Sequence, residues 1–216
     1  MSEPSFSERM RAQARPTWEA ILDHRFFREI AADTVEESVF ARYLGVEYAF
    51  VDTAAAALGY AVAKAPSFAE RRHLALGLHG LVTEQEQFFV RAFAAMGVKP
   101  RPQGERDPLS APLHDLFLTV ARDEGYEEIL ACTLAAEWMY LTWCSAAAKA
   151  PSARRPISDW VALHAGGPFA ESVAWLRGEI DRKGPRLPPA RQSRLLALFE
   201  QALAAEIPFH DAAYSQ

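Results

Sequence analysis

Residues 127–149 read EEILACTLAAEWMYLTWCSAAAK, and this stretch decides the fold. Its apolar side chains cover every face of a helix, which is typical of a helix buried nearly all round. Residues four positions apart share a face, and one such stripe consists of Cys132, Ala136, Tyr140 and Cys144, with Glu137 beside it. An acid and a phenol on a buried helix indicate a pocket. The alternative is an ordinary core with a satisfied Tyr140 hydroxyl and a Glu137 paired with an arginine.

The rest of the chain shows the same helical pattern. Ala, Leu, Glu and Arg are abundant, β-branched residues are sparse, and apolar residues recur at helical spacing. The predicted helices span residues 16–32 with a break near His24, 33–63, 67–96, 114–124, 127–149, 157–164, 169–182 and 190–214. Residues 97–112 are rich in Pro and charge and predict a loop, and residues 1–15 predict a flexible segment or a short helix. We therefore expect an all-α protein with a single helical domain over residues 1–216.

Three helix ends can be predicted from single residues. Asp33 or Thr34, each followed three residues later by a glutamate, is expected to cap the second helix as part of a capping box. Ser67 with Glu70 is expected to cap the third helix, and Gly97 to end it.

Composition and charge limit the classes of function. The 216 residues carry a formal net charge of −5 and a pI near 5.7, so nothing in the overall charge favours nucleic acid or an anionic membrane as a partner. The N-terminal residues lack the apolar region of a secretory signal, and no stretch approaches the roughly 20 apolar residues of a membrane-spanning helix. Cys132 and Cys144 lie too far apart on one helix to bridge within a monomer and are expected to be reduced. We expect a soluble, cytoplasmic protein.

Two further acids interrupt apolar helix faces. Glu47 shares a face with Tyr43 and Phe50, although it could also lie at the exposed edge of its helix. Glu206 precedes Pro208, which removes a helical hydrogen bond and predicts a kink, and the alternative for Glu206 is a solvated side chain near a fraying C-terminus. Together with Glu137, the sequence thus has one acid on the apolar face of each of three long helices.

Common catalytic motifs are missing from the sequence. It contains no glycine-rich phosphate loop, no G-x-S-x-G elbow and no H-E-x-x-H. The one Glu-x-x-His pair, Glu70 with His73, lies in a charged first turn, whereas a ferritin-like di-iron site needs two such pairs. The sequence therefore predicts no metal and no cofactor. A carboxylate-rich metal site remains open, and its possible ligands are Glu47, Glu137, Glu206, His164 and His210.

Four segments, in their order and spacing, resemble the TenA (thiaminase II) family. They are YLGVEYAF at 43–50, ILACTLAAEWMYL at 129–141, DWVALHAGGPF at 159–169 and FEQALAAEIPFHDAAY at 199–214. The resemblance covers nearly the whole chain and implies the all-helical heme-oxygenase-like fold, assembled as a homotetramer or homodimer. It also implies hydrolysis of an aminopyrimidine, chiefly 4-amino-5-aminomethyl-2-methylpyrimidine, in thiamin salvage.

The resemblance also assigns roles by position. Glu47 falls on the family's aspartate, which holds the ring nitrogen and amino group of the pyrimidine, and Glu206 falls on the C-terminal glutamate that acts in proton transfer. Tyr140 matches the tyrosine one turn past the nucleophile, and Phe50 and His164 occupy positions of tyrosines in the family. Among the aromatic residues near these segments, Tyr48, Phe50, Trp138 and Tyr140 could sandwich a flat ring.

The sequence departs from the family at the nucleophile. The family's cysteine lies in a Pro-Cys pair, and here that pair is Ala135-Ala136. Glu137 could replace the thiol by activating water or by adding directly, Cys132 or Cys144 could be a displaced thiol, or the protein could bind a pyrimidine without hydrolysing it. We expect a hydrolase without the usual cysteine that uses Glu206 and Glu137. The alternatives are a non-catalytic pyrimidine-binding or regulatory protein and a di-metal oxygenase on the same fold.

Overall fold

The computed structural model describes residues 3–100 and 105–215, and all its regular structure is helical within those ranges. The α-helices are α1 (Phe6–Gln13), α2 (Arg15–Leu22), α3 (Arg25–Ala31), α4 (Glu37–Lys64), α5 (Phe68–Gly80), α6 (Glu86–Met96), α7 (Ala111–Asp123), α8 (Tyr126–Ala147), α9 (Arg155–Ala165), α10 (Gly167–Lys183) and α11 (Pro189–Asp211). A π-helix, η1 (Leu81–Gln85), joins α5 to α6, and the short 3-10 helices are η2 (Gly184–Arg186) and η3 (Ala212–Tyr214). The all-α prediction is confirmed.

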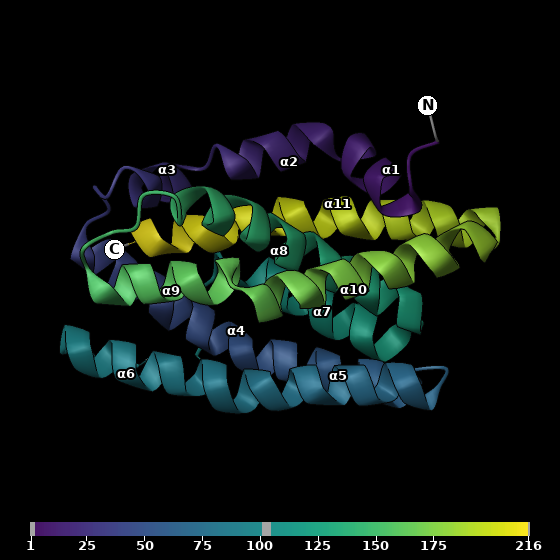
Figure 1. The fold of residues 1–216 in the computed structure, drawn as a ribbon, viewed down its shortest axis with the longest axis horizontal. Coiled ribbons are helices and arrows are strands. Elements are labelled where there is room, and N and C mark those ends of the chain that lie inside the picture. Colours follow the sequence, from purple (N-terminus) through teal and green to yellow (C-terminus); the bar gives the residue numbers. More distant parts are fainter. Residues whose placement is uncertain (1–2, 101–104, 216) are drawn as a thin grey trace.

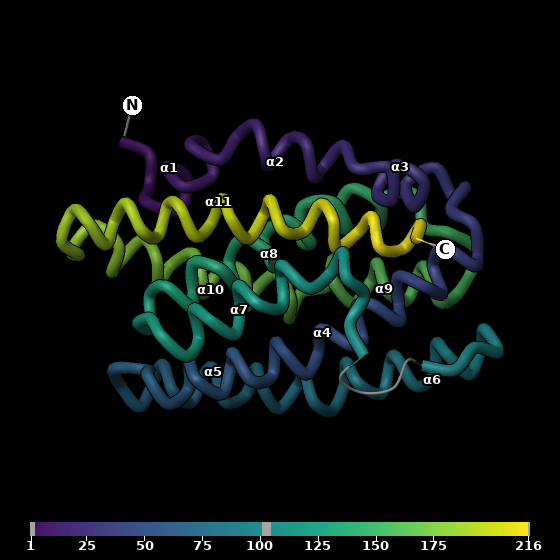
Figure 2. The backbone as a smooth tube through the Cα atoms, turned by 180° about the vertical axis from the view of Figure 1, so that it is seen from behind, coloured from purple at the N-terminus to yellow at the C-terminus, as the bar shows by residue number. Residues whose placement is uncertain are grey.

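Helix α8 lies at the centre of the bundle. It packs against α11 along much of its length and against α7, α9, α10 and α4 on its other faces. Buried residues occur on all its sides, as the sequence of 127–149 predicts. Figures 1 and 2 show α1, α2 and α3 along one side of the bundle and α5 and α6 along the opposite side.

The N-terminal residues are mostly ordered as helix. Ser5 caps α1 in a capping box with Glu8, and Phe6 and Met10 are buried against the rest of the protein. The predicted break near His24 separates α2 from α3, and the His24 ring accepts a hydrogen bond from the Phe26 amide at 3.1 Å. Residues 1–2, part of the segment expected to be flexible or a short helix, lie outside the described residues.

The predicted cap of α4 is wrong. The helix begins at Glu37 with Glu36 as N-cap, and no side chain caps its first turn. The Asp33 carboxylate instead accepts hydrogen bonds from Ser152 and Arg154, and the Asp33 backbone has a φ of 56°. The Asp33 carboxylate therefore pairs with Arg154, which is distant in the chain, and does not cap α4. The sequence around Asp33 does not predict this pairing.

The predicted helix 67–96 forms in three parts. Ser67 caps α5 as expected, and Gly97, with a φ of 64°, ends α6 as expected. Between them, the π-helix interrupts the regular α-helical hydrogen bonding. The predicted loop 97–112 includes residues 101–104, which are outside the described ranges, and α7 begins slightly early at Ala111.

The last predicted helix also holds. Pro208 lies inside α11, yet the chain stays helical to Asp211 and continues into η3. Glu206 is buried with 1% exposure, so the alternative of a solvated glutamate is wrong. No helix among the described residues is long and apolar enough to cross a membrane.

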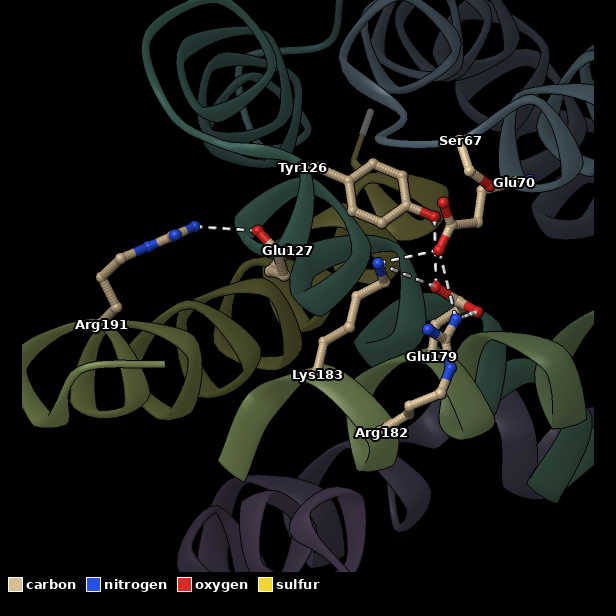
Figure 3. A network of polar contacts seen from close by, with 8 residues as sticks. All are labelled: Ser67, Glu70, Tyr126, Glu127, Glu179, Arg182, Lys183 and Arg191. Carbon is tan, nitrogen blue, oxygen red and sulfur yellow. Dashed lines mark hydrogen bonds and ion pairs between the residues drawn. The ribbon is translucent and has the colours of Figure 1, made fainter. Parts of the chain in front are cut away.

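An ion-pair network joins α5 to α10 next to the start of α8 (Figure 3). Lys183 Nζ lies 2.8 Å from Glu70 Oε1, and Arg182 contacts both Glu70 and Glu179. Burial raises the pKa of Glu70, but hydrogen bonds, first of all from Lys183, outweigh it and bring that pKa to about 2. The network holds two walls of the cavity described next.

Candidate active site

The bundle contains a partly open cavity of about 290 Å³. Its walls come from α4, α5, η1, α7, α8, α9, α10 and α11, and most of the lining side chains are apolar. This volume is close to the lower limit of typical ligand pockets, about 300 Å³, and suits a ligand with one substituted ring. Neither Lys nor Arg is among the lining residues that the structure describes.

Three glutamates from three α-helices meet at this cavity, and a fourth, Glu84, lines it from η1. Glu47 of α4 and Glu206 of α11 are buried, whereas Glu137 of α8 is partly exposed to the cavity. Glu206 Oε2 has no hydrogen-bond partner among the described residues. Native proteins rarely leave a buried carboxyl oxygen unpaired, so this atom is available to a ligand or to water.

The three acids influence one another's ionisation. Burial raises the pKa of Glu47 to about 7, although hydrogen bonds to Tyr140 and Tyr43 oppose the rise. Burial, and then the charge of Glu47, raises the pKa of Glu137 to about 7 and that of Glu206 well above its usual value. A site of this kind can hold some carboxyls protonated and others ionised near neutral pH.

Tyr140 is at the centre of a buried hydrogen-bond network. Its hydroxyl oxygen lies 2.9 Å from Glu47 Oε2, 2.9 Å from the Tyr43 hydroxyl and 3.2 Å from His210 Nε2. The α8 backbone points Tyr140 to the cavity one turn after Ala136, and both residues line it. Tyr140 is buried with its hydroxyl bonded, as in the alternative of an ordinary core tyrosine, and it also lines the cavity.

His164 and Phe50 complete two walls. The Nδ1 of His164 donates a hydrogen bond to the Trp160 carbonyl at 3.0 Å, and burial lowers the pKa of His164 to about 4, so its ring is neutral. The ring centroids of His164 and Tyr140 are 5.3 Å apart. Phe50 makes edge contacts with Phe117 and Phe209, which also line the cavity.

The structure does not bring every predicted residue to the cavity. The Tyr48 ring packs against Phe89 and Phe93 and is not among the lining residues. Trp138, another aromatic considered for stacking, packs against Trp18 and Phe199 instead. These two rings fill the core around the site.

The cysteines are also away from the cavity. Cys132 and Cys144 are buried as free thiols, and neither is a lining residue. Burial raises the pKa of both thiols, which disfavours the reactive thiolate. The hypothesis of a displaced thiol therefore gains no support, while Glu137 and Ala136 do line the cavity.

Several lining residues were not predicted from the sequence. Leu81, Glu84 and Gln85 come from the π-helix, and Thr133 and Ser172 add two hydroxyls. On the α5 and α10 side, the rings of His73 and Trp175 stack with centroids 3.9 Å apart. π-turns are frequent at functional sites, but no residue pattern in 67–96 marks this one.

The di-metal hypothesis gains no support from the arrangement of the candidate ligands. Within residues 3–100 and 105–215, no group of three or more His, Cys, Asp or Glu side chains is placed to hold a metal ion. The Nδ1 of His210 donates to the Glu206 carbonyl and its Nε2 contacts Tyr140, so both ring nitrogens already have partners.

Comparison with known proteins agrees with this architecture. The chain is 23% identical to an aminopyrimidine aminohydrolase of Halalkalibacterium halodurans over 98% of this chain and 96% of that protein. A TenA homologue from Pyrococcus furiosus has a similar structure, with a TM-score of 0.89, 21% identity, and coverage of 97% of this chain and 100% of that one.

A third comparison supports the predicted heme-oxygenase-like fold. A domain of unknown function with that fold from Shewanella denitrificans superposes with a TM-score of 0.63 at 14% identity, covering 99% of this chain and 93% of that one. The fold prediction is confirmed. A family model matches residues 11–216, and the chain belongs to the TENA/THI-4/PQQC family.

Proposed function

We propose that this protein hydrolyses an amino-substituted pyrimidine, chiefly 4-amino-5-aminomethyl-2-methylpyrimidine, without a cysteine nucleophile. The observation that carries the proposal is the meeting of Glu47, Glu137 and Glu206 with Tyr140 at one small, largely apolar cavity. The relative named aminopyrimidine aminohydrolase supports the substrate class. In this proposal the reaction consumes water and the aminomethyl compound and yields the hydroxymethylpyrimidine and ammonia.

Glu47 and the aromatic residues would bind the ring. A carboxyl group that can be protonated or ionised near pH 7 suits the paired acceptor and donor atoms of an aminopyrimidine edge. Phe50 and Tyr140 present apolar ring surface to the cavity, and neutral His164 adds a polar atom to its wall. Tyr48 is left out of this binding role, because its ring packs away from the cavity.

Glu137 and Glu206 would divide the acid and base roles. As a carboxylate, Glu137 would take a proton from water, whose oxygen then replaces the amine on the exocyclic carbon. Glu206, which burial keeps protonated to higher pH, would give its proton to the departing amine. The partly exposed position of Glu137, beside Ala136, leaves room for that water.

The test is steady-state hydrolysis of the aminomethylpyrimidine and of thiamin by the native protein, Glu137→Gln and Glu206→Gln. The native protein should turn over the aminomethylpyrimidine, and both variants should lose activity by at least about 100-fold, the usual contribution of a general acid or base. Circular dichroism and unfolding curves check that both variants fold. Full activity in folded Glu206→Gln would contradict the assignment of that residue, and full activity in Glu137→Gln would remove Glu137 from the mechanism.

A second candidate is a binding protein without hydrolytic activity. The observation in its favour is Ala136, a methyl group at the position that lines the cavity one turn before Tyr140. In that case the pyrimidine would stabilise the protein against heat, and product analysis would detect no turnover of either compound.

A further inference from the structure

The Tyr140 hydroxyl is the meeting point of three buried polar groups. Its oxygen is in hydrogen-bond range of Glu47 Oε2, the Tyr43 hydroxyl and His210 Nε2. All four side chains are buried, and they come from α4, α8 and α11. Each contact needs one proton to be a hydrogen bond, so the positions of the protons decide the state of the network.

His210 enters this network as an acceptor. Its Nδ1 lies 2.8 Å from the carbonyl oxygen of Glu206, which has no proton to give, so the proton of the neutral ring is on Nδ1. The Nε2 lone pair then faces Tyr140. The rings of Phe26 and Phe27, with centroids 5.7 and 4.7 Å from that of His210, enclose the imidazole, and burial lowers its pKa to about 3.

Counting protons favours one arrangement. The phenols of Tyr43 and Tyr140 supply two protons for three contacts. If Glu47 is ionised, Tyr140 has one proton for two acceptors: donating it to Glu47 leaves His210 Nε2 without a donor, and donating it to His210 leaves the Tyr140 and Glu47 oxygens 2.9 Å apart with no proton between them. If Glu47 is protonated, Glu47 and Tyr43 both donate to the Tyr140 oxygen and Tyr140 donates to His210, so every contact is a hydrogen bond. A buried acceptor without a donor is destabilising, which favours the protonated form.

We propose that His210 is a positioning residue that draws the Tyr140 proton to its own Nε2, so that Glu47 keeps a proton in the ligand-free site and presents it to an acceptor atom of the ligand. When Glu47 gives that proton to a ring nitrogen, the resulting carboxylate accepts the hydrogen bond of Tyr140 in turn. The inference rests on the proposed function for the nature of the ligand, whereas the network is present in the ligand-free protein.

The described lining residues supply no lysine or arginine charge that would reverse this state. The titratable groups that face the network from the packed elements are Glu137 and Cys144 of α8, His164 of α9, Glu206 and Asp211 of α11, and His24 before α3.

The test follows the ionisation of Glu47 directly. Carboxyl carbon NMR of protein labelled at the glutamate side chains, with the Glu47 signal assigned by its loss in Glu47→Gln, gives a titration midpoint for Glu47. In His210→Phe, which keeps an aromatic ring in the enclosure, Tyr140 is free to donate to the carboxylate. The midpoint should fall by about one pH unit. In His210→Gln, whose amide oxygen can accept from Tyr140, the midpoint should stay near that of the native protein.

His114→Phe is the matched control. His114 is also buried and hydrogen bonded, to Thr53 at 2.7 Å, but it does not line the cavity, so this change should leave the Glu47 midpoint in place. An unchanged midpoint in folded His210→Phe would overturn the proposal. If that variant does not fold, nitrogen NMR of the native protein decides, because a His210 ring protonated on Nε2 between about pH 5 and pH 8 would overturn it as well.

Neither measurement depends on turnover. If the Glu47 midpoint falls in His210→Phe but the native protein hydrolyses neither the aminomethylpyrimidine nor thiamin, the proposed function is contradicted and the role of His210 stands. If the native protein hydrolyses the aminomethylpyrimidine but the Glu47 midpoint is the same in His210→Phe, the proposed function stands and the role of His210 is contradicted.

Discussion

The burial of Glu47 and Glu206 beside the cavity lowers the stability of the fold. A carboxylate loses its hydration when it is buried, and the site has no cation among its described lining residues to compensate. At Glu47 the loss of hydration raises the pKa from 4.5 to about 7. A residue that destabilises the fold and lines a cavity is expected at a functional site, where activity and stability are in conflict.

Glu47→Gln should therefore stabilise the protein at alkaline pH. Between pH 4.5 and pH 7 the folded protein holds a proton on Glu47 that the unfolded chain has lost, so stability falls as pH rises through this range. The glutamine variant has no such loss and keeps a polar partner for Tyr140. Its free energy of unfolding at pH 8 should exceed that of the native protein by up to about 3 kcal/mol, with little difference at pH 4.5.

Urea unfolding at both pH values measures this difference. Glu19→Gln is the control, since Glu19 lies exposed on α2 and its substitution should leave the pH dependence unchanged. The explanation fails if Glu47→Gln and the native protein lose the same stability between pH 4.5 and pH 8.

Part of this chemistry could be predicted residue by residue. Glu47, Glu137 and Glu206 stand out because each is an acid on an apolar helix face, and all three line the cavity. The contacts of Tyr140 with Tyr43 and His210 could not be predicted, because they join helices far apart in the chain. Tyr48 shows the converse limit, since helical spacing cannot tell a ring that packs in the core from one that faces a ligand.

At the scale of single elements, the π-helix shapes one wall of the cavity. A π-turn is equivalent to one residue inserted into an α-helix, so it rotates the residues that follow it without ending the helix. Leu81, Glu84 and Gln85 of η1 line the cavity, whereas Val82 is 47% exposed. The Thr83 hydroxyl donates to the His79 carbonyl at 2.6 Å and so satisfies one acceptor of the widened turn.

Deleting Val82 should restore a regular α-helix from α5 to α6 and remove the wall that η1 forms. Because one residue is lost where one is in excess, the flanking helices keep their packing, and the free energy of unfolding should change by no more than about 1 kcal/mol. Binding of the aminomethylpyrimidine should weaken at least about tenfold. Calorimetric titration gives the affinity, and Val82→Ala, which keeps the chain length, should bind like the native protein. Equal affinity in the deletion variant would mean that η1 does not contact the ligand.

Helix existence was more predictable than helix ends. The apolar spacing located the helices because burial on the core side fixes that period, and His24, Ser67 and Gly97 mark ends by local chemistry. The start of α4 depends instead on the ion pair of Asp33 with Arg154, which lies 121 residues away in the chain. The π-turn has no local sequence signal at all.

At the scale of the whole molecule, the fold brings together acids that are far apart in sequence. Glu47 of α4 and Glu206 of α11 are far apart in the sequence, and the central helix α8 carries Glu137 and Tyr140 between them. The resemblance to a family predicted that these acids share one site. Helical spacing alone left each acid with the alternative of a structural or solvent-exposed side chain. A single domain, a cytoplasmic location and assembly as a tetramer or dimer stay predictions.

Because residues from so many helices line the cavity, a ligand bound there should stabilise the whole bundle. At a concentration 100 times its Kd, a ligand that binds only the folded protein adds about 2.7 kcal/mol to the free energy of unfolding. In a chain of this length that corresponds to a rise in Tm of roughly 5–10 °C. Thermal unfolding of Glu206→Gln with 4-amino-5-aminomethyl-2-methylpyrimidine measures the rise without loss of ligand to turnover. 2-Methylpyrimidine, which lacks both amino groups, should give a much smaller rise because it cannot pair with the carboxyls. Equal shifts with the two compounds would show that the acids do not select the ligand, and no shift with either would contradict the hydrolase and the binding protein alike.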